Sequence, residues 1–154
     1  MAVVVTLDCS SCVGTVVLTE YGRWTPLAEG TAPYRATALT EVGPQDDHLV
    51  LVDAEGQWTV GFLNWNYLPL VSGTQTGTGP AVVFFDSSAT QLEVTVSDIG
   101  ADDVVAIRAF AADTTPGGPM LHGWSGPGTD TRKVNLPGVV AISTNGSWTM
   151  TPRA

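Results

Sequence analysis

Few residues in this chain could do metal or redox chemistry, and they lie far apart. The 154 residues include two cysteines, in Cys9-Ser10-Ser11-Cys12, and two histidines, His48 and His122. A structural zinc site needs four such ligands, and a thioredoxin-like pair would begin a helix, whereas strand-like segments flank this one. We therefore predict two reduced thiols in a turn. The alternative is a disulfide closing that turn, expected if the mature protein works outside the cell.

Acid–base catalysis has one candidate group, Asp46-Asp47-His48. It would need to meet His122 in a pocket, and nothing in the spacing requires that. The sequence also contains no glycine-rich phosphate loop and no nucleophile elbow. We predict a solvated loop at 46–48 and a protein with no enzymatic activity and no cofactor.

Calcium binding has one candidate loop, in which three aspartates lie close together: Asp98, Asp102 and Asp103. Carboxylate oxygens are the ligands that Ca²⁺ prefers, but no EF-hand spacing accompanies these three. Solvated turn residues are the competing interpretation, and we predict no bound metal.

The best candidate for a binding site is the aromatic and amide-rich segment 62–70. As a strand, it would place Trp65 and Tyr67 on one face and Asn64 and Asn66 on the other. Exposed aromatic rings stack on sugars, and amides hydrogen-bond sugar hydroxyls. The same side chains equally suit core or intersubunit packing, so both interpretations stay open.

These residues must be positioned by β-strands, because good helix formers are scarce. Val and Thr supply twenty residues each, and 17 Gly and 10 Pro punctuate the chain. Alternation and turn signals predict an all-β chain, an immunoglobulin-like β-sandwich or compact barrel. The predicted strands are 2–8, 14–20, 23–27, 34–41, 48–53, 57–64, 66–71, 81–86, 91–97, 103–111, 131–135, 139–143 and 147–151.

An internal repeat is visible in three segments. Each has Val, two apolar residues, three variable residues, Gly, one variable residue, Trp and Thr, and they start at Val16, Val50 and Val140. Each predicts a hairpin in which Gly supplies a positive φ. Further matches at offsets of 89–90 residues predict two related β-units, 1–71 and 81–154, joined by a linker-like stretch at 72–80. One sandwich with a long loop at 72–80 is the alternative.

The charge balance excludes several partners. Six basic against fifteen acidic residues give a net charge of −9, which disfavours nucleic acid and anionic membrane surfaces. No apolar run is long enough for a transmembrane helix, and the start lacks the basic region of a secretory signal. Only 14% of residues are charged, so the Thr- and Gly-rich surface is inexpensive to desolvate in an interface.

Taken together, these features resemble the small all-β accessory proteins of tailed-phage virions. The shared features are the leaderless start, the acidic balance, the Thr/Val/Gly-rich composition and the lack of a catalytic set. The resemblance implies a non-enzymatic structural protein that binds and reinforces or decorates a capsid lattice. Its partners would be other virion proteins and copies of itself, and its place the virion, after synthesis in the host cytoplasm. A tail component and a carbohydrate-binding β-sandwich are the alternatives.

Overall fold

The structure, a computed structural model, describes residues 2–41, 49–112 and 120–154. Across these ranges almost every element is a β-strand, and the one helical element is a single 3-10 turn. The prediction of an all-β fold is therefore confirmed. The chain divides into two compact units, Met1–Tyr67 and Leu68–Ala154, each with its own hydrophobic core.

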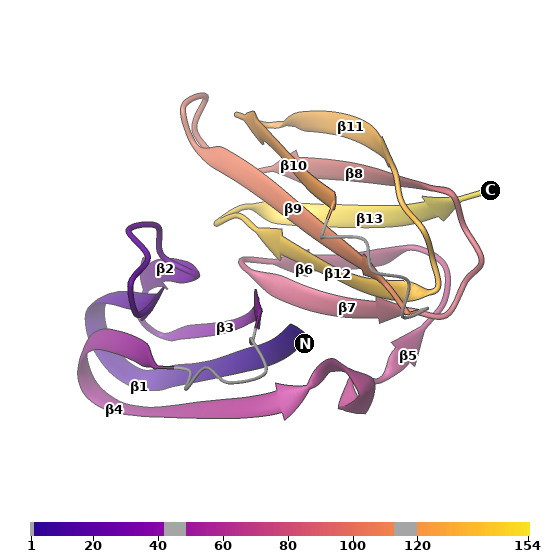
Figure 1. Ribbon diagram of the computed structural model, residues 1–154. Coiled ribbons are helices and arrows are strands. Elements are labelled where there is room, and N and C mark those ends of the chain that lie inside the picture. The colour runs from indigo at the N-terminus through magenta and orange to yellow at the C-terminus, as the bar shows by residue number, and fades with distance from the viewer. Residues whose placement is uncertain (1, 42–48, 113–119) are drawn as a thin grey trace. The chain divides into compact units, whose positions relative to one another are not determined.

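The first unit is a four-stranded antiparallel sheet built around one long strand (Figure 1). β1 (Ala2–Glu20) pairs with β3 (Tyr34–Glu41) along its first half and with β2 (Ala28–Thr31) along its second half. On its other side β1 pairs with β4 (Val50–Asn64). The register shifts between Asp8 and Ser11 and again between Val13 and Val17. Such register shifts mark β-bulges, in which extra residues on one strand bend the pair. Figure 1 shows β1 and β4 curving together.

The core of the first unit lies on one face of this sheet. β1 contributes alternate residues before the bend and after it: Val5, Leu7, Cys9, Cys12, Val16 and Leu18. This period of two is the pattern that makes a Val- and Thr-rich segment a strand with one buried face. On β4 the residues facing this core, such as Val52 and Val60, are only half-buried. The reason is that β4, within the described residues, has a strand on one side only.

The second unit is a β-sandwich. Its strands are β5 (Leu70–Val71), β6 (Gln75–Thr78), β7 (Ala81–Phe85), β8 (Gln91–Ser97), β9 (Val104–Ala111), β10 (Met120–Ser125), β11 (Gly128–Lys133), β12 (Gly138–Ser143) and β13 (Ser147–Arg153). One sheet has the order β10-β9-β12-β7, with β5 added in parallel at its edge, and the other has the order β11-β8-β13-β6.

The strand order of the second unit is that of a jelly roll. From β6 to β13 the chain passes from one sheet to the other at every connection except β9–β10 and so forms eight strands in two four-stranded layers. The predicted β-sandwich is thus confirmed, and its strand order differs from that of an immunoglobulin domain. An immunoglobulin sandwich begins with a hairpin-like pair in one sheet, whereas β6 and β7 lie in different sheets.

The core of the second unit fills the space between its two sheets. The fully buried side chains include Phe85, Leu92, Ile142 and Met150. Trp148 closes one margin of this core, and its indole N–H donates a 2.9 Å hydrogen bond to the carbonyl of Gly79. This tryptophan therefore covers the core at its edge.

Of the three predicted Gly-Trp hairpins, the first is present, because β1 and β2 are consecutive and pair antiparallel, and the other two are wrong. Gly22 does turn the chain with a positive φ, but Trp24 lies outside any strand and is fully exposed. Gly56 sits inside the continuous strand β4, opposite Cys12. The third segment forms β12 and β13, which belong to opposite sheets and do not pair with each other.

The stretch predicted as a linker, 72–80, instead contains β6, which pairs with β13 in the second unit. The matched segments of the proposed duplication also lie differently. The duplication matches segment 5–7 with 94–96 and segment 16–18 with 105–107, each 89 residues apart. The first members of these pairs are both on β1, whereas the second members are on β8 and β9, in different sheets. The two units therefore do not share a strand order.

Candidate functional site

The predicted aromatic site forms a helical turn rather than a strand face. Asn64 ends β4, and Trp65–Tyr67 form the 3-10 turn η1. The side-chain oxygen of Asn64 accepts a 3.1 Å hydrogen bond from the backbone N–H of Asn66. Such a local bond competes with the strand ladder and favours a turn. The prediction that Trp65 and Tyr67 share one strand face is therefore wrong.

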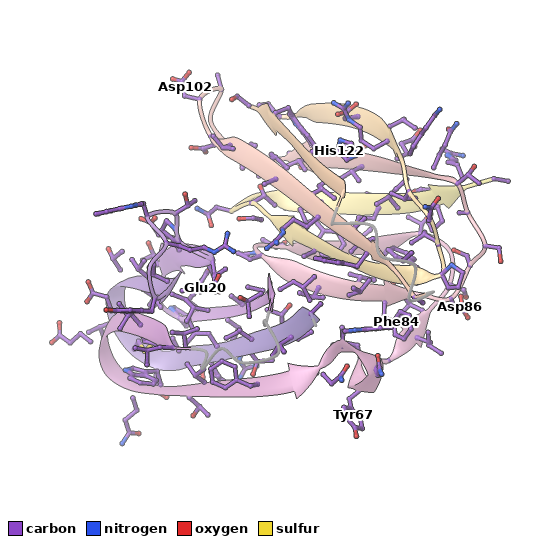
Figure 2. All side chains as sticks on the ribbon, in the orientation of Figure 1. Glu20, Tyr67, Phe84, Asp86, Asp102 and His122 are labelled. Carbon is purple, nitrogen blue, oxygen red and sulfur yellow. A yellow bond between two sulfur atoms is a disulfide. The ribbon has the colours of Figure 1, made fainter. Side chains whose placement is uncertain are left out.

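The exposure of this segment is uneven. Tyr67 is 83% exposed, and Figure 2 shows its ring projecting away from the turn. Trp65 is half-buried, as is Asn64, while Asn66 is exposed. Of the two rings predicted to stack on a sugar, only Tyr67 is largely exposed.

The three candidate calcium ligands do not converge. Asp102 lies at the tip of the β8–β9 loop (Figure 2), and Asp98 has the positive φ of 61° typical of a turn residue. Asp103 accepts a 2.7 Å hydrogen bond from the Gly100 N–H and so holds the loop together. In the described part of the chain, no three Asp, Glu, His or Cys side chains form a group that could hold a metal ion.

The candidate acid–base group, Asp46, Asp47 and His48, lies outside the described residues. His122, its predicted partner, is on β10 opposite Ile107 in the second unit. Among the residues that the structure describes, no helix is long and apolar enough to cross a membrane.

The apolar edge of the first unit is a surface that the sequence predicted only in part, because the predicted binding segment 62–70 includes Phe62 but not Trp58. Trp58 and Phe62 are 46% and 51% exposed. Both lie on the face of β4 that carries Val60, which packs against the core. We call Trp58, Val60 and Phe62 the apolar rim. The alternation in 57–64 was a usable signal, but it predicts a buried face, and only the topology reveals that β4 is an edge.

The two cysteines form a disulfide, so the prediction of reduced thiols is wrong and the alternative is correct. The bond spans the bend in β1, where Asp8 also organises the chain. The Asp8 carboxylate accepts hydrogen bonds from the Ser10 hydroxyl (2.6 Å) and backbone N–H (3.0 Å), and it pairs with Arg35 at 3.1 Å. The hydrogen bonds from Ser10, followed by the hydrogen bond from Arg35 and its charge, lower the pKa of Asp8 to about 2.

Removing this disulfide should weaken the first unit only modestly. A cross-link stabilises mainly by restricting the unfolded chain, and a loop closed between residues three apart in sequence gives about 2 kcal/mol. We expect Cys9→Ser/Cys12→Ser to raise amide hydrogen exchange in peptides covering β1 by about 30-fold at most. Peptides covering β12 and β13, in the unit without cysteine, are the internal control and should not change. Loss of protection in both units would contradict this prediction.

The described residues thus offer one apolar surface on β4 and one exposed aromatic turn, and neither contains a catalytic or metal-binding group. No protein-family model, curated protein or solved structure gives a significant match to this chain.

Proposed function

We propose that this chain is a non-enzymatic structural protein of a phage particle, which attaches to a capsid lattice through its first unit and decorates or reinforces it. The observation that carries the proposal is the distribution of exposed large apolar side chains. Eight of the ten in the described residues belong to the first unit: Val13, Tyr21, Trp24, Leu49, Leu51, Trp58, Phe62 and Tyr67. Scattered apolar residues are ordinary on a protein surface, so the interaction surface is inferred from Trp58 and Phe62, which lie on the same face of β4.

The apolar rim is the most specific part of this surface. Trp58 and Phe62 continue the core of the first unit to its margin, beside an edge strand whose outer backbone groups have no partner strand in the described chain. A partner that adds a strand along β4 would satisfy the backbone and cover both rings. Burying the exposed half of each ring would contribute about 1 kcal/mol. A 67-residue unit with a small core gains substantially from such cover.

Three further properties support attachment to a particle. Jelly rolls occur in viral capsid proteins, although they also occur in lectins and cupins, so this support is an analogy of fold. The Cys9–Cys12 disulfide suits an extracellular particle, since such bonds persist on virion surfaces. The net charge of −9 keeps the free protein soluble before assembly. We expect the chain to form homo-oligomers on its lattice.

The test uses particles purified by density gradient from the lysate of cells that produce the phage and this chain. We expect the chain to band with the particles at a fixed ratio to the major capsid protein. The variant Trp58→Ser/Phe62→Ser should lower that ratio at least tenfold, because two apolar anchors are lost. Val104→Ser, at an exposed apolar residue of the second unit, is the control and should band like the wild type.

The ratio of this chain to the major capsid protein also distinguishes a capsid decoration protein from a tail component. A decoration protein would approach the copy number of capsid subunits or a simple fraction of it, whereas a tail component would be present in far fewer copies. Circular dichroism of each variant checks that the sheets have formed. Absence of the chain from the particles, or equal banding of the double variant and the wild type, would refute the proposal.

A further inference from the structure

The outer face of one sheet of the second unit is covered with hydroxyl groups. In β8 and β13 the residues of one parity, including Val94, Val96, Trp148 and Met150, enter the core. Residues of the other parity face outward, and nine of these thirteen positions across the four strands are Thr or Ser. The other four, Gln91, Glu93, Lys133 and Arg153, lie toward one end of the sheet. We call the nine Thr and Ser residues the hydroxyl face: Thr76, Thr78, Thr95, Ser97, Thr129, Thr131, Ser147, Thr149 and Thr151.

Strand register aligns these hydroxyls in rows. The longest row runs across all four strands: Thr76, Thr149, Thr95 and Thr129. The next row contains Thr78, Ser147 and Ser97. Neighbours in a row are about 5 Å apart, and successive rows are about 7 Å apart.

The hydroxyls differ in whether they are already paired. Thr95 and Thr129 share a 2.8 Å hydrogen bond. By contrast, Thr76, Thr78 and Thr149 make no side-chain hydrogen bond within the described part of the chain. These unpaired hydroxyls are both donors and acceptors, so they are available to a ligand with the same chemistry.

A depression of about 330 Å³ lies over these unpaired groups. Its lining comes from β6, β8 and β13: Thr76, Gly77, Thr78, Thr95, Ser97, Ser147, Trp148 and Thr149. The volume is within the range of small-ligand sites. No lining residue is charged, in a chain whose net charge is −9. An anionic ligand would therefore find no cation in the site and a repulsive field around it.

We propose that the hydroxyl face binds an uncharged glycan, with a sugar unit seated in this depression. A sugar presents vicinal hydroxyls that can pair with the rows of Thr and Ser hydroxyls. A protein partner is disfavoured because none of the exposed large apolar residues lies on β6, β8, β11 or β13, so no hydrophobic anchor is available. The site is separate from the predicted one at Trp65 and Tyr67 and goes beyond the attachment role proposed for the first unit.

The experiment probes the full-length protein with an array of neutral oligosaccharides (glucans, mannans, galactans and N-acetylglucosamine oligomers), with sialylated and sulfated glycans beside them. Affinity for the best glycan is then measured by NMR titration. We expect binding to neutral glycans only. Thr76→Val/Thr149→Val removes two facing hydroxyls without changing side-chain shape and should weaken binding at least tenfold. Thr31→Val, at an exposed strand threonine of the first unit and outside the hydroxyl face, should bind like the wild type.

Several results would overturn the proposal. One is no binding to any neutral glycan at millimolar concentration, and another is binding to the charged glycans alone. A third is an unchanged glycan affinity in Thr76→Val/Thr149→Val. If Tyr67→Ala then abolished binding, the glycan site would lie at the η1 turn. Since valine is at least as favourable as threonine in a strand, each variant should fold, and its unfolding curve checks this.

Discussion

Replacing Phe85 by alanine is expected to destabilise the second unit by about 3–5 kcal/mol. Phe85 is a fully buried side chain at the end of β7, in contact with the core between the two sheets. Its loss removes apolar burial and leaves a cavity that two paired sheets cannot easily close. A cost of this size is a large part of the stability of an ordinary domain.

The matched control is Phe62→Ala in the first unit. Phe62 is 51% exposed on the edge strand β4, so its truncation should cost less than about 1 kcal/mol. Urea unfolding measures both effects, and amide hydrogen exchange assigns them to β8 and β13 or to β1. If the two variants lost equal stability, the core described for the second unit would be incorrect.

Strands with a regular period of two were predictable from the sequence. Segments 34–41 and 91–97 are strands with the predicted boundaries. In β8 the residues Leu92, Val94 and Val96 are all buried, and their neighbours are more exposed. Such alternation depends only on local sequence, because one face meets a core and the other meets solvent.

Strands with polar or glycine-containing sequences were not predictable in this way. The segment 75–78 (Gln-Thr-Gly-Thr) has the composition of a linker, but it is a sheet edge that pairs with β13. Its glycine is required because Trp148 occupies the space of a Cβ at Gly77. β10 was missed because His122, Gly123 and Ser125 interrupt its apolar residues. In both strands the deciding partner lies far away in the sequence.

The candidate sites show the same limit. The exposed Tyr67 lies in the segment predicted for binding, but a local hydrogen bond from Asn66 to Asn64 makes a turn of it. The apolar rim was predicted only in part because Trp58 and Phe62 have the parity of core residues. That they are exposed follows from β4 pairing only with β1 in the described chain. Whether a strand lies at the edge of a sheet depends on the order of all the strands, so the alternation within one strand cannot predict it.

Replacing Gly146 by alanine should destabilise the second unit by about 1–3 kcal/mol or more. The sequence suggested that this glycine is needed for a positive φ in an Asn-Gly hairpin, yet Gly146 is not among the residues with positive φ. A Cβ at this position would instead overlap the carbonyl oxygen of Ser97 and crowd Ile99. The Ser97 carbonyl cannot move aside freely, because Ser97 pairs with Ser147 in the β8–β13 ladder.

Gly128→Ala is the control that separates crowding from the general effect of removing a glycine. Gly128 begins β11 opposite Val96, and a Cβ there meets no atom within 4 Å. Because alanine restricts the unfolded chain more than glycine does, the free energy of unfolding of this variant should be unchanged or higher by about 0.5–1 kcal/mol. Urea unfolding of both variants gives the comparison. A stable Gly146→Ala would mean that the β12–β13 connection does not pass against the end of β8.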